Sequence, residues 1–305
     1  MYSIKGIKRN RAGVSTIAVI AVVAIVIVAA AAVYLVLSDK NEEETWGPGT
    51  AFTYDISQND EKVATMGQII VGQSADDYFV KATLTYAGIE GEMTVYELSS
   101  KSQIEGAKKT GTIEMDTMDG KKTLEIWEYT VQTQGARSDV KSYADPSTGL
   151  TYRNEATTLG MEEVQDLTAY DLVWQKQYKQ SGDVGKTYKY SASFTSLIFS
   201  ADVKIVADCI DGKFGVMYDF SSFSGGKYYT LCNNPQGLPD EAVDSGQTAK
   251  LTDTIDGEVD VGIWTLTEID GSTWKFYVNG ESKIIYKFDM TSAGMTLSFV
   301  LKEKP

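Results

Sequence analysis

Hydrophobic and polar residues alternate in many short segments after residue 45, which is the pattern of half-buried β-strands. In MTLSFVL at 295–301, Met, Leu, Phe and Leu occupy one face, whereas Thr, Ser and Val occupy the other. Upstream, Asp270-Gly271 and Asn279-Gly280 separate runs rich in Ile, Thr, Trp, Phe and Tyr. Because such pairs suit the positive φ angles of two-residue hairpin turns, the pattern predicts a three-stranded meander followed by a last strand.

The strand pattern occurs twice, because three sequence blocks return in the same order at nearly constant spacing. The blocks are GTAFTY at 49–54 and GKTYKY at 185–190, DTMDGKKTLEIWEYT at 116–130 and DTIDGEVDVGIWTLT at 253–267, and KSYADPSTGLTYRNEATTLGM at 141–161 and KFYVNGESKIIYKFDMTSAGM at 275–295. This indicates a tandem duplication, with copies at about 45–162 and 181–305. We therefore predict a mainly β protein of two tandem homologous antiparallel domains, with an α+β arrangement as the alternative.

Two kinds of segment fit the strand pattern less well. Between the copies, residues 163–180 carry Leu167, Tyr170, Trp174 and Tyr178 at roughly helical spacing. A linker helix and an extended last strand of the first copy both suit this segment. Residues 99–111 and 237–250 occupy corresponding places in the two copies and are interpreted as loops or short helices.

One long apolar segment precedes the copies. Residues 14–37 contain no charge, glycine or proline, and as a helix they would extend roughly 36 Å, enough to cross a ~30 Å hydrocarbon core. The preceding segment 1–13 is basic and the following linker 38–44 is acidic. Under the positive-inside rule, the N-terminus is cytoplasmic and both β domains lie outside the cell membrane.

The sequence RNRAGVSTIAVI at 9–20 leaves the fate of this segment open. An uncleaved anchor is favoured, because the apolar run is longer than the core of a secretory signal. The same residues resemble the class III signal of type IV pilins and archaeal pilin-like proteins. That resemblance implies cleavage near Ala12 or Gly13 and assembly through the apolar run, although Ala12 departs from the charged residue expected before the glycine.

Composition excludes several function classes. The net charge of the chain is −14, so its surface repels phosphate backbones and we expect no nucleic-acid partner. Histidine is absent, which removes the commonest general base and the commonest metal ligand. No nucleophile elbow or phosphate-binding loop is present. We therefore expect a non-enzymatic protein without a cofactor.

Aspartates in the repeated phrase raise the question of calcium. The second copy has Asp253, Asp256, Glu258 and Asp260, but the first copy replaces the later acids by Lys121, Lys122 and Thr123. A calcium site would need its oxygen ligands in both copies if it were the reason for the repeat. The phrase is better interpreted as a hairpin turn, and we predict no metal site.

Repeated aromatic residues are the candidate ligand-binding residues. They occupy equivalent positions in the two copies: Trp127, Tyr143 and Tyr152 in the first copy, and Trp264, Tyr277 and Tyr286 in the second. A core that both copies must build is the simpler explanation of this repetition. An aromatic-lined cavity that binds a ligand is the more specific hypothesis. The two cysteines, Cys209 and Cys232, both lie on the expected outer side. We predict a disulfide between them.

A further resemblance concerns residues 143–160, YADPSTGLTYRNEATTLG. The segment resembles the turn between two strands in the lipoprotein-carrier superfamily, whose curved half-barrel shelters an acyl chain or senses a bound protein. The second copy keeps the basic and acidic positions but lacks the proline and Thr-Gly-Leu. The resemblance implies a half-barrel and a lipid or protein ligand.

These observations lead to one main hypothesis and two alternatives. The chain is expected to be a single-pass, membrane-anchored, extracytoplasmic binding or cell-envelope protein without catalytic activity, whose partners are the membrane and a lipid or cell-surface protein. The first alternative is a pilin-like structural subunit processed near Gly13. The second is a carbohydrate-active enzyme, which would need a pair of carboxylates about 5–9 Å apart in an open cleft.

Overall fold

The computed structural model describes most of the chain after residue 44. The described residues are 3–5, 45–88, 91–101, 106–133, 136–175, 178–194, 197–221, 226–268 and 271–305. Among them, no helix is both long enough and apolar enough to cross a membrane. The predicted membrane span at 14–37 and the acidic linker 38–44 lie outside the described residues, as does nearly all of the basic segment 1–13.

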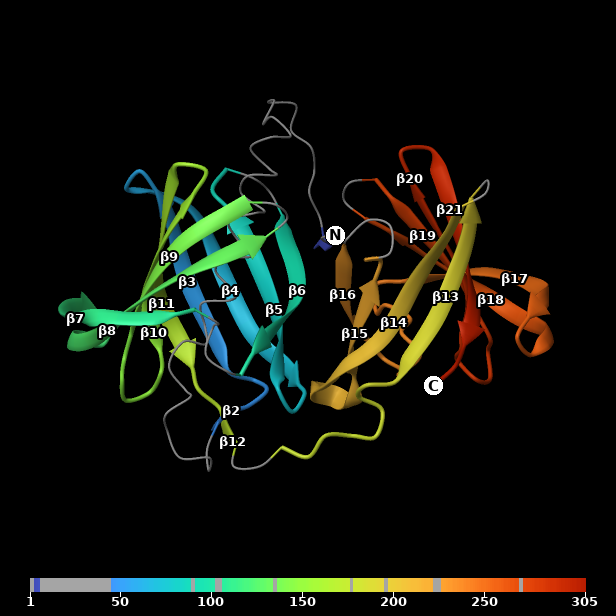
Figure 1. Ribbon diagram of the computed structural model, residues 1–305, viewed down its shortest axis with the longest axis horizontal. Helices are drawn as coiled ribbons and strands as arrows, with labels where there is room; N and C mark the ends of the chain where they lie inside the picture. Colours follow the sequence, from blue (N-terminus) through green and yellow to red (C-terminus); the bar gives the residue numbers. More distant parts are fainter. Residues whose placement is uncertain are drawn as a thin grey trace. The chain divides into compact units, whose positions relative to one another are not determined.

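Antiparallel β-sheet makes up nearly all of the described structure, as the alternating pattern predicted. The described residues include no α-helix, only a single 3₁₀ turn at Ile210–Gly212. A short strand, β1 (Ser3–Lys5), lies near the N-terminus. The rest divides into two compact units between Lys179 and Gln180, called here the first unit and the second unit (Figure 1).

The first unit is a curved antiparallel sheet whose strands follow one another along the chain. Its spatial order is β6-β5-β4-β3-β11-β10-β9-β8-β7, so one pairing, between β3 and β11, joins the start of the unit to its end. Strands β2 and β12 form a separate small pair. The strands are β2 (Thr45–Trp46), β3 (Ala51–Gln58), β4 (Glu61–Gln73), β5 (Asp77–Tyr86), β6 (Glu92–Ser100), β7 (Lys108–Thr117), β8 (Gly120–Thr133), β9 (Ala136–Ala144), β10 (Thr151–Thr158), β11 (Met161–Asp171) and β12 (Trp174–Gln175).

The second unit has the same strand order. Its sequence of neighbours is β16-β15-β14-β13-β21-β20-β19-β18-β17, with β13 paired to β21 as β3 is paired to β11. Each strand therefore has a counterpart in the first unit. The strands are β13 (Thr187–Phe194), β14 (Leu197–Cys209), β15 (Phe214–Asp219), β16 (Lys227–Cys232), β17 (Val243–Thr254), β18 (Gly257–Thr267), β19 (Thr273–Val278), β20 (Ile285–Ser292) and β21 (Met295–Glu303).

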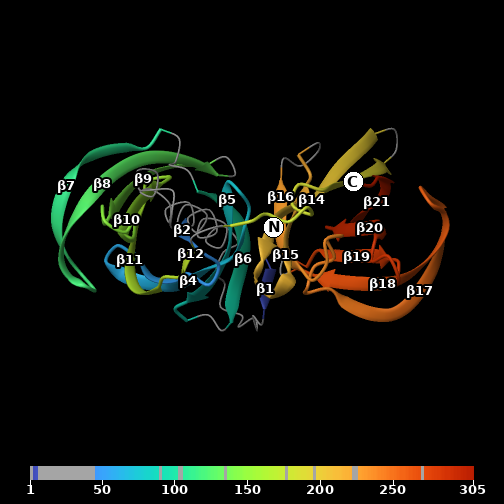
Figure 2. The same cartoon turned by 90° about the horizontal axis from the view of Figure 1, so that it is seen from below.

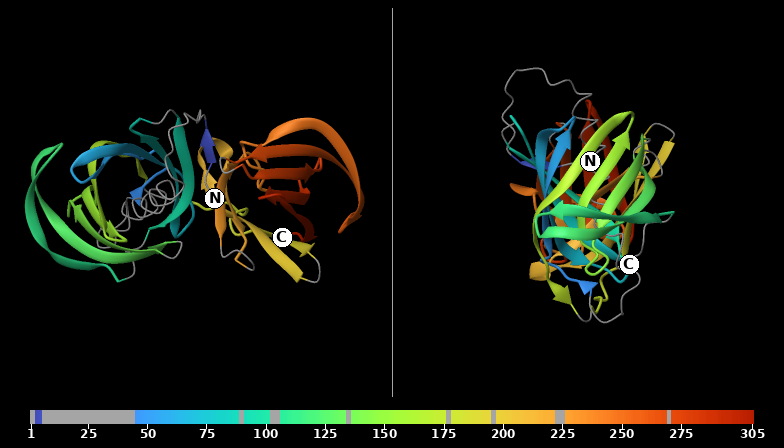
Figure 3. Two further views of the ribbon diagram at one scale, coloured as in Figure 1. Left: turned by 90° about the horizontal axis from the view of Figure 1, so that it is seen from above. Right: turned by 90° about the vertical axis from the view of Figure 1, so that its left-hand side faces the viewer.

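Each sheet is strongly curved, so that strands far apart in the order face one another. Figure 2 views the sheets from one side, and the left panel of Figure 3 views them from the other. In the second unit, the ring of Tyr218 on β15 lies 5.6 Å from that of Trp274 on β19 and 5.7 Å from that of Phe288 on β20. The face that carries these rings is called the inner face.

Alternation explains which residues reach the inner face. On β3, Phe52, Tyr54 and Ile56 are buried whereas the residues between them are half-buried. On β21, Phe299 and Leu301 are buried as the sequence predicted, but Met295 is 63% exposed because the strand begins there, beside a turn. The two-residue period of a strand thus determines which side chains enter the core wherever one face of the sheet is buried.

Several sequence interpretations need correction. Residues 161–171 form a strand that pairs with both β10 and β3, so the first unit continues beyond residue 162, and the strand alternative rather than the helix holds for residues 163–171. Part of each expected loop, 99–111 and 237–250, belongs to the exposed strands β7 and β17. The three-stranded meander is present, but residues 279–284 form a longer loop, in which the Asn279 side chain accepts hydrogen bonds from the N–H groups of Glu281 and Ser282.

Candidate functional site

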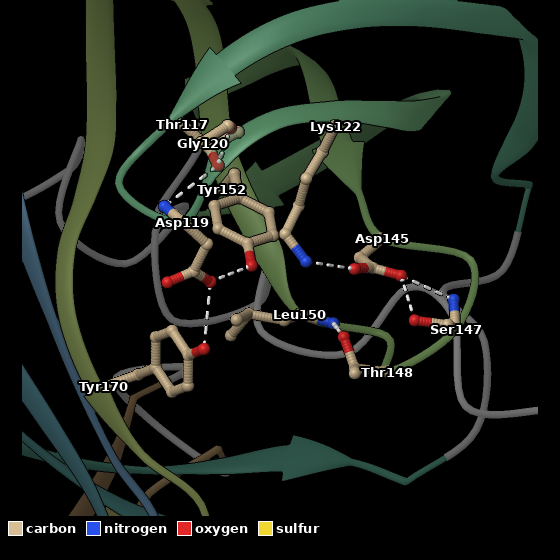
Figure 4. Close-up of polar contacts among 10 residues, drawn as sticks. All are labelled: Thr117, Asp119, Gly120, Lys122, Asp145, Ser147, Thr148, Leu150, Tyr152 and Tyr170. Carbon is tan, nitrogen blue, oxygen red and sulfur yellow. Dashed lines mark hydrogen bonds and ion pairs between the residues drawn. The ribbon is translucent and has the colours of Figure 1, made fainter.

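The repeated Asp-Thr phrase forms a hairpin tip that is tied to a distant strand. Between β7 and β8, the hydroxyl of Thr117 donates to the carbonyl of Gly120 at 2.7 Å and accepts from the N–H of Asp119 at 3.2 Å (Figure 4). Gly120 has a φ of 90°, which a residue with a side chain rarely adopts. The turn directs the Asp119 carboxylate to the hydroxyls of Tyr152 and Tyr170, and both donate to it.

The second unit repeats this arrangement. Thr254 bonds to the carbonyl of Gly257 at 2.6 Å, and Asp256 accepts a hydrogen bond from the hydroxyl of Tyr286. At the position equivalent to Tyr170, Lys304 donates to Asp256 at 2.6 Å. The repeated phrase is therefore explained by its role as a turn whose aspartate fastens the hairpin to the rest of its unit.

These bonds shift the pKa values of the groups involved. The hydrogen bond from Tyr152, with a smaller one from Tyr170, holds the pKa of Asp119 below its usual value. Burial, followed by the hydrogen bond to Asp256, raises the pKa of Tyr286 to about 12. Each tyrosine is therefore a neutral donor and each aspartate a charged acceptor at physiological pH, which is the stronger kind of hydrogen bond.

A loop next to the first tip is also held by charge. The Nζ of Lys122 lies 3.0 Å from one carboxylate oxygen of Asp145, and the other oxygen accepts from the N–H of Ser147 at 2.6 Å (Figure 4). Burial alone would raise the pKa of Asp145, but the bonds from Ser147 and Lys122 outweigh it and lower that pKa. Lys122 also lies over the ring of Tyr152, 5.3 Å from its centroid.

The other predicted tyrosines form a second repeated contact. Tyr143 donates to Glu155 at 2.8 Å, and its counterpart Tyr277 donates to Asp289 at 2.8 Å. Burial, with the bond to Asp289, raises the pKa of Tyr277 to about 12. These pairs join neighbouring strands in each sheet.

The predicted tryptophans lie on the inner face, apart from these tyrosine pairs. Trp127 is half-buried beside Tyr129, Val140 and Ala156, and its Nε1 donates to Glu125 at 3.2 Å. Trp264 packs at the margin of the aromatic core of the second unit. The six residues predicted from the sequence are thus spread over separate contacts in two units, and the structure does not gather them into one site.

In the second unit, the inner face is filled by the unit's own side chains. Phe276, Phe288 and Phe299 stand side by side on β19, β20 and β21, and the first two are directly paired, as are the last two. All three are fully buried. Tyr218 and Tyr228 are paired across β15 and β16, on the other side of the curved sheet. The ring of Tyr218 packs against Phe276 and Phe288, and the ring of Tyr228 packs against Trp274.

The equivalent positions of the first unit are polar or small. Ser142, Asn154 and Gln165 are paired across β9, β10 and β11 in the register of the three phenylalanines. The Ser142 hydroxyl donates to the Asn154 side chain at 2.6 Å, and Gln165 continues the chain to Glu163 at 2.7 Å. On the other side of the curve, Ala82 and Val95 stand where the second unit has Tyr218 and Tyr228. We call Ser142, Asn154, Glu163 and Gln165 the polar wall.

Two buried polar groups on this face are unusual: a carboxyl group with a raised pKa and an amide without a hydrogen-bond partner among the described residues. Burial raises the pKa of Glu163 to about 7, although hydrogen bonding to Gln165 works in the opposite direction. On β4, Gln68 is 2% exposed, and neither its amide nitrogen nor its amide oxygen has a hydrogen-bond partner in the described part of the chain. Its counterpart in the second unit, by register, is Val203. A buried amide without a partner costs about 1–3 kcal/mol, so this position is atypical of a simple core.

The polar wall was missed by the sequence reasoning, although a signal for it was present. The two copies share residues such as Trp127 and Trp264, whereas their inner faces differ at aligned positions. Comparison at a spacing of 134 residues pairs Ser142 with Phe276 and Asn154 with Phe288. Differences between the copies, rather than identities, mark the face that distinguishes the first unit.

The predicted disulfide is absent. Cys209 and Cys232 are both free thiols, the second fully buried. They belong to β14 and β16, which are separated by β15. Strands two places apart are roughly 10 Å from each other, too far for the 4.4–6.8 Å Cα separation of a disulfide. Burial, together with the charge of Asp208, raises the pKa of Cys209 to about 12.

Metal ligands do not converge within the described part of the chain. No group of three or more His, Cys, Asp or Glu side chains that could hold a metal ion occurs there. The repeated Asp119 and Asp256 instead accept hydrogen bonds from tyrosines.

No known protein family and no characterised protein sequence matches the chain. Among solved structures, it is similar to MucB in complex with the periplasmic part of MucA, at 11% identity and a TM-score of 0.27, covering 85% of this chain and 88% of that chain. MucB alone gives 10% identity and a TM-score of 0.26, covering 93% and 94%. A DUF3598-family protein of unknown function from Nostoc punctiforme gives 10% identity and a TM-score of 0.16, covering 85% and 96%. Similarity at these TM-scores carries no argument about function.

Proposed function

We propose that the chain is a membrane-anchored, extracytoplasmic, non-catalytic binding protein in which the inner face of the first unit receives the ligand. The observation that carries this proposal is the difference between two sheets of the same strand order. Where the second unit fills its inner face with Phe276, Phe288 and Phe299, the first unit has Ser142, Asn154 and Gln165. On this proposal the units arose by tandem duplication, and only the first one keeps an inner face that binds this ligand.

The chemistry of the face indicates an amphipathic ligand. Strands β3 to β6 contribute buried apolar side chains, including Ile56, Met66 and Leu84. Strands β9 to β11 contribute the polar wall. A ligand with one apolar and one hydrogen-bonding side would complement both halves, and its polar side could satisfy the amide of Gln68.

A polypeptide segment satisfies these requirements better than an acyl chain. Peptide N–H and C=O groups supply the donor and the acceptor that the Gln68 amide lacks, whereas a hydrocarbon chain would leave both amide atoms unsatisfied. The membrane anchor at 14–37 rests on the sequence alone and holds the units on the outer side of the membrane. The ligand would therefore be a segment of a cell-envelope or surface protein.

Native mass spectrometry of the full chain, gently extracted from its own membrane, tests the proposal. Because the inner face is shielded from solvent, a bound ligand should leave slowly and survive extraction. The double variant Ser142→Phe/Asn154→Phe introduces the residues of the second unit and should lose the adduct. Thr157→Phe is the matched control, since Thr157 lies on the same strand as Asn154 but on its opposite, exposed face, and it should keep the adduct.

The outcomes separate the parts of the proposal. Identical spectra for the wild-type protein and both variants would refute a binding role for this face. An adduct that is lost in the double variant but fragments as a lipid would refute the polypeptide assignment and leave the binding face in place.

The same spectrum tests the pilin-like alternative, which the sequence RNRAGVSTIAVI favours. A chain that begins near Gly13 and forms a series of oligomers would support a structural subunit. A chain that begins at Met1 or Tyr2 supports the anchor.

A further inference from the structure

A pocket of about 350 Å³ lies at one end of the inner face of the second unit. One side is formed by Trp264 and Gly262 on β18 and by Val278 on β19, and the other by Leu238 and Asp240 in the segment after β16. The volume lies within the range of small-molecule sites, and the lining combines apolar and polar groups in the way such sites do. This pocket is separate from the polar wall, which belongs to the first unit.

Two polar atoms of the pocket-lining residues make no hydrogen bond with the residues that the structure describes. The hydrogen bonds of the described residues include none from the Nε1–H of Trp264, whereas its counterpart Trp127 donates to Glu125. A Cβ atom built at Gly262 would lie 3.9 Å from that nitrogen, so the indole N–H lies beside the gap left by the glycine. In Asp240, Oδ2 bonds to Lys213 at 2.6 Å, but the buried Oδ1 has no hydrogen-bond partner in the described chain.

We propose that this pocket binds an uncharged saccharide. A sugar hydroxyl is both donor and acceptor, so neighbouring hydroxyls can donate to the Asp240 carboxylate and accept from Trp264 Nε1. The indole beside Val278 and Leu238 offers an apolar surface for the carbon-bound face of a sugar ring.

Charge disfavours the other ligand classes. Asp240 is already paired with Lys213, so the pocket does not require a cation. The pocket is also lined by Asp244 and Lys283, whose opposite charges offset one another, and the chain carries a net charge of −14, so an anionic ligand gains no attraction. A neutral, hydroxyl-rich ligand needs no charged partner in the pocket and is not repelled by the net negative charge of the chain.

Fluorine NMR of the full chain labelled with 5-fluorotryptophan tests this assignment. The chain has five tryptophans, and the Trp264→Phe variant identifies the Trp264 resonance by its loss. Maltose, cellobiose and N,N′-diacetylchitobiose are titrated separately. We expect at least one of them to shift the Trp264 resonance saturably, with a dissociation constant on the order of 1 mM, while the Trp127 resonance stays in place.

Gly262→Val provides the blocking variant. Gly262 has no positive φ, so a valine is sterically tolerated by the backbone, and its methyl groups would occupy the space beside Trp264 Nε1. The shift should disappear in this variant, while unchanged resonances of the other tryptophans report that the protein is folded. No shift with any of the three sugars up to about 100 mM, an equal shift with glycerol, or a shift that persists in Gly262→Val would overturn the assignment.

Discussion

The phenol of Tyr286 on β20 donates a hydrogen bond to the carboxylate of Asp256 at the tip of the β17–β18 hairpin. We expect Tyr286→Phe to lower the free energy of unfolding by about 1 kcal/mol, because the bond has a charged acceptor but the aspartate is partly exposed and keeps Lys304. Chemical denaturation measures the loss, and amide hydrogen exchange should show faster exchange at residues 254–257. Unchanged exchange at the tip would show that the bond does not fasten the hairpin.

Glu163 makes the stability of the first unit depend on pH. Burial raises its pKa from 4.5 to about 7, so the folded state retains a proton that the unfolded state has released between these values. The contribution of Glu163 is therefore fully present below about pH 4.5, declines as the pH rises to about 7, and is absent above that.

We expect Glu163→Gln to remove this dependence. At pH 8, the variant should be more stable than the wild-type protein, by on the order of 2 kcal/mol, and at pH 4.5 the two should be similar. Urea denaturation across this range provides the measurement. Parallel stability curves for the two proteins would show that Glu163 is ionised in the folded state at neutral pH.

One loop has the same conformation in both units, but only one copy has a glycine at its left-handed position. The N–H of Gly149 donates to the Asp145 carbonyl, and that of Lys283 donates to the Asn279 carbonyl in the same way. The φ angles are 78° at Gly149 and 60° at Lys283. Gly149→Lys should therefore cost about 1 kcal/mol, whereas Lys283→Gly should change stability by only a few tenths of a kcal/mol, since relieved strain is offset by unfolded-chain entropy.

Thermal or urea unfolding of the two variants checks this asymmetry. If Gly149→Lys is neutral, the loop tolerates a side chain in both copies and the glycine has no conformational role. An equal loss in both variants would indicate instead that the Lys283 side chain makes a stabilising contact.

The features predicted from the sequence are those that depend on local pattern. Alternation identified the strand character of residues such as Phe299 and Leu301, and Asp-Gly identified the turns at Asp119 and Asp256. Strands β7 and β17 were missed because they are largely exposed on both faces and so lack an alternating apolar pattern. The same limit applies to β11, where Glu163 and Gln165 occupy buried positions that normally hold apolar residues.

Contacts between distant residues were harder to anticipate. The repeated aromatics suggested a lined cavity, whereas Tyr152 and Tyr286 are hydrogen-bond donors to hairpin tips 33 and 30 residues away. Nothing in a single copy reveals such pairs. Only the strand order brings their members together, and that order is a property of the folded sheet.

The two cysteines should behave as buried thiols rather than as a disulfide. Cys232 is fully buried, and the pKa of Cys209 is raised to about 12, so at pH 8 neither residue presents an accessible thiolate. We expect a maleimide reagent to react slowly with the native protein and to label both cysteines once urea unfolds it without reductant. Labelling of neither cysteine after unfolding, followed by labelling of both when a reductant is added, would restore the disulfide that the sequence suggested.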